Sequence, residues 1–109
     1  MANTFKLKTK ANVGVTTVGI YTAPASPTTV VIGITLANTS GSGVNVGVGI
    51  TRAGTTEDVK LLKNAPIPQG SSLEFMGGNK VVLETTDTLT VDSDTNNSVD
   101  AALTIMEIT

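Results

Sequence analysis

The chain has 109 residues, a formal net charge of −2, two Phe, one Tyr, and no Trp, His or Cys. The acidic balance argues against nucleic-acid binding, which needs a basic surface, and the scarcity of aromatic rings argues against a carbohydrate-binding platform. Without histidine and cysteine the common catalytic triads and zinc sites cannot form, so we expect no catalytic residue, no cofactor and no enzyme activity.

The composition favours β-structure. More than a third of the residues are Thr, Val or Ile, whose branched side chains fit a pleated sheet better than a helix, and 11 glycines can supply turns. We therefore expect an all-β fold: a single-domain antiparallel β-sandwich over residues 1–109. It should contain about eight or nine short strands with jelly-roll-like connections.

The first predicted strand, TFKLKTK, is strongly basic. Its alternation places Phe5 and Leu7 on one face and Lys6, Lys8 and Lys10 on the other, as in a strand with one wet side. The segment lacks the apolar core of a signal peptide, and no stretch is apolar enough for a membrane helix. We therefore expect synthesis in the cytoplasm without export or membrane insertion.

Acidic residues gather towards the other end of the chain, where Asp100 and Glu107 lie. Two interpretations of this charge separation remain open. The basic strand can lie beside an acidic C-terminal strand of the same domain, or the two charged patches can meet between neighbouring subunits.

The central part of the chain predicts further strands. Residues 15–22 form a weak candidate strand. Residues 28–38 alternate, with Val30, Ile32, Ile34 and Leu36 on one face. Residues 44–50 alternate in the same way, with Val44, Val46, Val48 and Ile50 inward. We expect the last two segments to form a long hairpin around NTSGSG. Glycines on its back face indicate either the close approach of another segment or an uncovered face.

A proline segment, LLKNAPIPQGSSLEF, interrupts the alternation. Pro66 and Pro68 favour an extended chain and cannot donate ladder hydrogen bonds. We expect this segment to cross from one sheet to the other, with Ile67 as a buried plug. The alternative is a docking motif for another protein.

The final strand, SVDAALTIMEIT, has two apolar faces. Val99, Ala101, Leu103 and Ile105 share one face, and Ala102, Met106 and Ile108 make the other partly apolar. This strand should therefore lie in the middle of a sheet, or have its second face covered by a partner.

The segment DSDTNN resembles the start of a calcium loop, with oxygen ligands at Asp92, Asp94 and Asn96. The sixth position is Asn97 instead of glycine, and the twelfth is Leu103 instead of glutamate. We favour an Asx-rich turn, with a weak calcium site as the alternative.

The charge separation and the proline segment together suggest residues for protein contacts. These candidates are Lys6, Lys8, Lys10, Pro66, Ile67, Pro68, Asp100 and Glu107.

Four features carry a resemblance to known proteins. They are the tyrosine-to-proline strand exit in VGIYTAP, the blocks KNAPIPxGSSL and GGxKxVLExxDxLxVxS, and the EIT ending. From about Val13 onwards the chain resembles small β-rich virion structural proteins of tailed bacteriophages, especially those of marine cyanobacterial hosts. The resemblance implies a non-enzymatic protein, present in multiple copies as a ring or appendage on the tail or head–tail region. The expected partners are further copies of the chain and other virion proteins, without nucleic acid or membrane.

Two other functions remain as alternatives. The chain could be a capsid decoration protein, or a receptor- or glycan-binding module, although the few aromatic residues disfavour the latter.

Overall fold

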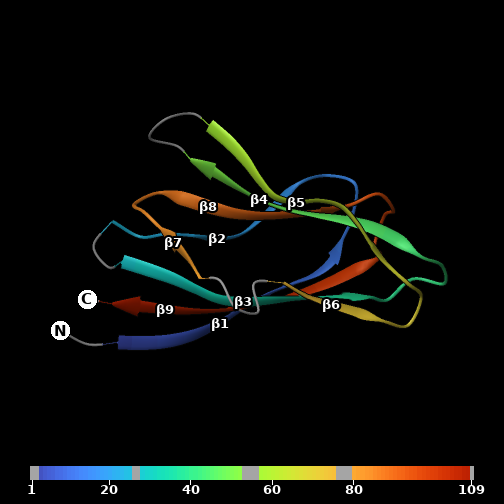
Figure 1. Ribbon diagram of the computed structural model, residues 1–109, viewed down its shortest axis with the longest axis horizontal. Helices are drawn as coiled ribbons and strands as arrows, with labels where there is room; N and C mark the ends of the chain where they lie inside the picture. Colours follow the sequence, from blue (N-terminus) through green and yellow to red (C-terminus); the bar gives the residue numbers. More distant parts are fainter. Residues whose placement is uncertain (1–2, 26–27, 53–56, 76–79, 109) are drawn as a thin grey trace.

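The computed structural model describes residues 3–25, 28–52, 57–75 and 80–108. In these ranges nine strands form two antiparallel sheets (Figure 1). The first sheet has the order β1 (Asn3–Val13), β9 (Val99–Ile108), β3 (Thr28–Asn38), β6 (Ser72–Phe75), and β7 (Val81–Leu83) also pairs with β3. The second sheet has the order β2 (Val18–Thr22), β8 (Asp87–Ser93), β4 (Val44–Arg52), β5 (Glu57–Ile67).

The strand order is that of a jelly roll. The short strands β6 and β7 pair with different parts of β3, so together they occupy one strand position. The eight resulting positions form two four-stranded sheets, and the chain passes repeatedly from one sheet to the other. The all-β, two-sheet, jelly-roll-like fold predicted from the sequence is confirmed.

The predicted hairpin of residues 28–38 with residues 44–50 is wrong. β3 belongs to the first sheet and β4 to the second, while β4 pairs with β5 and β8. The Asn38 side chain holds the crossing between them. Its Nδ2 donates to the carbonyl oxygens of Ser42 (2.8 Å) and Ile67 (3.0 Å), and its Oδ1 accepts from Ser40 N–H at 2.9 Å.

The expected inner face of residues 28–38 is also only partly correct. Ile34 and Leu36 are buried as expected, but Val30 and Ile32 are only half-buried, and Val31 is buried instead. The register with β9 shifts between Val31 and Gly33. Such a bulge inserts one residue and reverses the alternation on one side of it, which period-two counting cannot detect.

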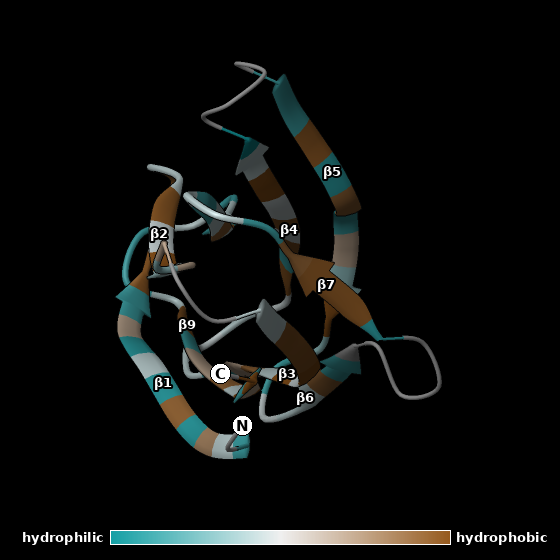
Figure 2. Cartoon of the chain, turned by 90° about the vertical axis from the view of Figure 1, so that its left-hand side faces the viewer, coloured by the Kyte–Doolittle hydropathy of each residue, from teal (hydrophilic) through white to brown (hydrophobic). Residues whose placement is uncertain are grey.

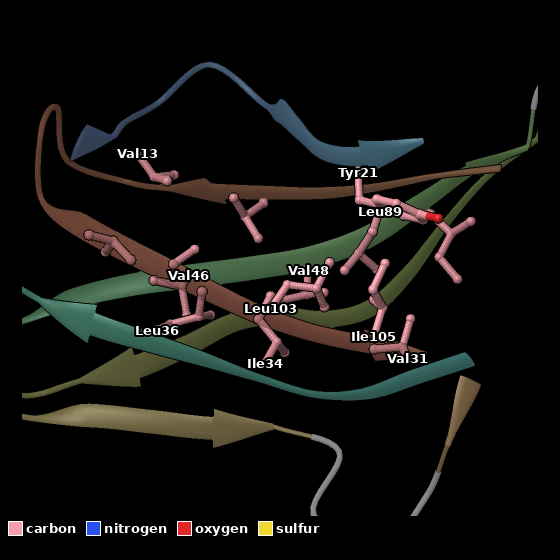
Figure 3. Packing of buried hydrophobic residues seen from close by; sticks show 14 of the residues in the cluster. Val13, Tyr21, Val31, Ile34, Leu36, Val46, Val48, Leu89, Leu103 and Ile105 are labelled. Atoms are coloured by element: carbon pink, nitrogen blue, oxygen red, sulfur yellow. The ribbon is translucent and has the colours of Figure 1, made fainter. Parts of the chain in front are cut away.

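The core lies between the two sheets. The inner face of β9 contributes Val99, Ala101, Leu103 and Ile105, and β4 contributes Val44, Val46, Val48 and Ile50, all as expected. Figure 3 shows Val46 and Val48 among Leu36, Ile34, Leu103 and Leu89 between the strands. β9 lies mid-sheet between β1 and β3, which is the first of its two predicted placements.

The back face of β4 is closely approached by other segments. A methyl group added at Gly49 would lie 2.8 Å from the Val59 carbonyl oxygen of β5 and 3.2 Å from Thr90 Oγ1 of β8. At Gly49 the glycine therefore marks the close approach of another segment and does not mark an uncovered face.

Gly49→Ala should destabilise the protein by about 1–3 kcal/mol, because the β5 backbone would have to move. Gly41→Ala is the matched control, since no atom lies within 4 Å of the added methyl group. Urea unfolding of both variants measures the difference. Equal midpoints would contradict the close approach.

Candidate functional site

A polar cluster joins the two sheets at the end of the sandwich where β1 begins and β9 ends. The Tyr21 hydroxyl from β2 donates to Glu107 Oε2 of β9 at 2.5 Å and lies 3.0 Å from Thr29 Oγ1 of β3. Lys6 Nζ of β1 lies 2.9 Å from Glu107 Oε1. Side chains of four strands from both sheets therefore form one cluster, in which Tyr21 and Lys6 bind the Glu107 carboxylate and Thr29 binds Tyr21.

The cluster reverses the expected orientation of β1. Lys6 pairs in register with Ile105, so the lysines lie on the inner side of the sheet at its edge, whereas Phe5 and Leu7 lie on the outer side and are 68% and 66% exposed. The physical reason is Glu107, the last inner-face residue of β9, which attracts the lysine side of β1. Alternation alone does not determine which face of a strand is buried.

The other charged candidates on these strands lie apart from Glu107. Lys8 Nζ is 6.0 Å from the centroid of the Tyr21 ring, a cation–π distance. Lys10 is exposed. Asp100 is exposed and accepts a hydrogen bond from Asn12 N–H at 3.0 Å, where the β1–β9 register shifts. Basic β1 thus lies beside β9 within one chain, and Lys10 and Asp100 remain on the surface.

The contacts in the cluster shift two pKa values in opposite directions. Burial raises the pKa of Tyr21 to about 12, and its hydrogen bond to the Glu107 carboxylate adds to the rise. The hydrogen bonds from Tyr21 and Lys6 lower the pKa of Glu107, and they outweigh its burial. Tyr21 therefore stays neutral and Glu107 ionised at neutral pH.

The proline segment lies at the end of β5, which is an edge strand. Pro66 is exposed opposite Asn45 within β5, and an edge strand is where a residue without a backbone N–H is tolerated. Ile67 is 1% exposed, and its side chain lies in the core. Pro68 is exposed, and the chain then turns through Gly70, at a φ of 74°, into β6 of the other sheet.

The calcium candidates do not converge. Asp92 Oδ2 accepts from Thr17 Oγ1 at 3.0 Å and lies 3.6 Å from Lys60 Nζ. Asp94 Oδ1 accepts from Asn45 N–H at 3.1 Å, and Asn96 is exposed in the turn. Among the described residues, no group of three acidic, His or Cys side chains could hold a metal ion. The segment is a turn whose carboxylates bind different neighbours.

Sequence reasoning missed a charged groove between β5 and β7. Asp87 is 4% exposed and accepts from Arg52 Nε at 3.2 Å and from Glu84 N–H at 2.9 Å, while Glu84 also pairs with Arg52. These two carboxylates raise the pKa of the Arg52 guanidinium, with the Asp87 hydrogen bond as the largest cause.

The groove beside this cluster has a volume of about 370 Å³. Its lining residues are Ile50, Arg52, Glu57, Val59, Val82, Glu84 and Asp87. Val82 and Val59 are 55% and 37% exposed there. The adjacent valines of KVVLET were the available signal, since one residue of such a pair must face outward in a strand.

Glu107→Gln tests the polar cluster. Loss of the charge weakens the Lys6 and Tyr21 contacts, so stability at neutral pH should fall by about 1–3 kcal/mol. The folded pKa of Glu107 is lowered, so its contribution is present above the unfolded value, about 4.3, and is lost as pH falls through the folded value. The stability difference between wild type and variant should therefore shrink on acidification. A difference that is constant from pH 7 to pH 3 in chemical denaturation would contradict this.

Ile67→Ala tests whether the proline segment is a plug. Loss of this buried side chain should cost about 2–5 kcal/mol, whereas Pro68→Ala, at an exposed position, should change stability by less than about 1 kcal/mol. Thermal and urea unfolding measure both. An unchanged Ile67→Ala melting curve would favour the docking alternative.

Comparison with known proteins gives the fold. No protein-family model matches the sequence, and the search of curated proteins finds no match. A chain from the acid-stable capsid structure of Helicobacter pylori bacteriophage KHP30 is similar, with a TM-score of 0.60, 10% identity, and coverage of 100% of this chain and 89% of that chain.

Two further structures share the fold. A chain from the disulfide-linked pili of Bacillus endospore appendages has a TM-score of 0.55, 17% identity, and coverage of 98% of this chain and 87% of that chain. A chain from infectious bursal disease virus strain Gx has a TM-score of 0.54 and 13% identity, with 96% of this chain matching 33% of that chain. At these identities the likeness establishes the fold, and the resemblance to tailed-phage virion proteins stays a prediction.

No helix among the described residues is long and apolar enough to cross a membrane.

Proposed function

We propose that the chain is a non-enzymatic structural protein of a tailed-phage virion. It forms one β-sandwich domain and assembles in multiple copies as a ring or appendage on the tail or head–tail region. The observation that carries the proposal is the jelly-roll topology, which is shared over the full chain with a chain from a phage capsid structure. Its partners are further copies of itself and other virion proteins.

The exposed apolar side chains support an assembly role, and the charged clusters support a non-enzymatic one. Phe5 and Leu7 are each about two-thirds exposed, although they are large apolar side chains on a regular strand. Exposed apolar clusters on small proteins often mark interaction sites. The charged groups that the structure brings together, at Glu107 and at Asp87, join strands of one chain. They therefore have a structural role and need no bound substrate.

A capsid decoration protein is the second candidate function. It is favoured by one observation, the origin of the similar phage chain in a capsid structure. The two candidates differ in where the copies lie on the particle and in how many there are.

Cryo-EM of the phage particles that encode this chain, with mass spectrometry of the same purified particles, tests the proposal. We expect peptides of the chain in the particles and repeated jelly-roll density on the tail or at the head–tail junction. Density distributed over the capsid lattice would favour decoration instead. Absence of the chain from purified particles would contradict both.

A further inference from the structure

β1 is attached to the sandwich almost without buried side chains. From Asn3 to Asn12 every side chain is exposed except that of Lys8, which is half-buried. Its neighbour β9, in contrast, buries every second side chain. Figure 2 shows β1 at the margin of the sandwich, with hydrophilic and hydrophobic residues alternating along it. Segments with few buried apolar contacts open at a lower free energy than the core, so opening of β1 does not require unfolding of the sandwich.

The contacts that hold β1 are made with β9 and β2. From Asn3 to Lys10 the strand pairs residue by residue with β9. Lys6 Nζ lies 2.9 Å from Glu107 Oε1, and Lys8 Nζ lies 6.0 Å from the centroid of the Tyr21 ring. None of these contacts requires that β1 and β9 belong to the same chain.

The chain has a hinge where β1 ends. Val13 is fully buried, and its carbonyl oxygen accepts a hydrogen bond from Ser98 N–H at 3.0 Å, so the chain is fixed from Val13 onwards. Just before it, the register with β9 shifts between Lys10 and Val13, and Asn12 has a left-handed φ of 58°. Residues 3–12, which we call the β1 arm, are therefore joined to the sandwich by a short irregular segment.

The position that the arm leaves identifies what can replace it. Without the arm, β9 becomes an edge strand with unpaired backbone groups, and Glu107 loses Lys6. A replacement must pair antiparallel with β9 and bring a cation to Glu107. The strand that the structure shows doing both is β1, so the occupant is the β1 arm of a second copy.

We propose that the β1 arm exchanges between copies: the arm of one copy pairs with β9 of a second copy, in the register that it uses within one chain, and its Lys6 binds Glu107 of the second copy. Such an exchange is a domain swap. This inference rests on the proposed function, because it names the contact through which copies of a structural subunit join. A chain's own arm competes at a high effective concentration, so exchange needs a high protein concentration.

Disulfide trapping tests the exchange, since the chain has no cysteine of its own. Thr9 of β1 lies opposite Ala102 of β9, and opposite residues of antiparallel strands are close enough for a disulfide. Thr9→Cys chains and Ala102→Cys chains of different mass are mixed at millimolar concentration and oxidised in glutathione buffer. We expect mainly the disulfide-linked heterodimer. A mixture of Thr9→Cys and Val15→Cys chains is the matched control and should give only traces, because Val15 lies outside β9.

The double variant Thr9→Cys with Ala102→Cys locks the arm. Oxidation at low concentration links β1 to β9 of the same chain. Light scattering coupled to size-exclusion chromatography at millimolar concentration should show wild-type assemblies larger than one chain and the oxidised double variant as a monomer, with assembly restored by reduction. A dimer indicates mutual exchange between two copies, and a larger assembly indicates an arm passed from each copy to the next; both support the exchange.

Variants of the hinge give a test without cysteine. Proline cannot adopt the φ of Asn12, and it lacks the N–H that donates to Asp100 Oδ1 at 3.0 Å. Asn12→Pro should therefore release the arm and raise the assembled fraction several-fold. Asn12→Gly keeps both features and should match wild type. These two variants decide the question if circular dichroism shows that a cysteine variant does not fold.

Three results would overturn the inference. They are a monomeric wild-type chain at millimolar concentration, a trapped heterodimer no more abundant than in the control mixture, or a folded Asn12→Pro chain that assembles no more than Asn12→Gly. Any of these results for a chain that is found in virions would overturn the exchange and leave the proposed function standing. Exchange by a chain that is absent from virions would do the reverse.

Discussion

The structure depends on burying the inner faces of two sheets against each other. β4 and β9, which lie in opposite sheets, each supply four alternating apolar residues to this layer. Neither sheet alone can shield its apolar inner face from water. The crossings that hold the two sheets against each other therefore matter for stability as much as the strands do. Asn38 shows this directly, because its amide bonds both the loop that leaves β3 and the end of β5. Ile67 is the last residue of β5 and is buried, so the Asn38 bond to its carbonyl oxygen links the crossing to the core.

Polar contacts close the layer where the apolar residues stop. At the end of β9 the inner-face position is occupied by Glu107, which a sandwich tolerates only because Tyr21 and Lys6 satisfy its oxygens. Asp87 has a similar role between β4 and the turn before β8, where Arg52 and the Glu84 backbone satisfy it. These charged side chains hold strands together, which leaves the exposed apolar residues as the features that the fold itself does not explain.

Those apolar residues connect the fold to the assembly role proposed above. In a jelly roll the two edges of a sheet carry different strands, here β1 on one side and β6 with β7 on the other. Different edges carry different side chains, so a molecule with this topology readily presents two unlike surfaces. Unlike surfaces on opposite sides of one subunit are what a repeating head-to-tail contact needs.

The sequence by itself determined the fold class, most strand positions and the inner faces of β4 and β9, because regular alternation is a local property of the chain. Only the tertiary structure decided where the alternation changes or which way it faces. The bulge between Val31 and Gly33 exchanged Val30 for Val31 in the core, and Glu107 turned the lysine side of β1 inward. The groove could not be predicted either, because β4, β5, β7 and β8 bring its lining residues together only after the two sheets have packed. Such contacts depend on register and strand order, which leave no local pattern in the sequence.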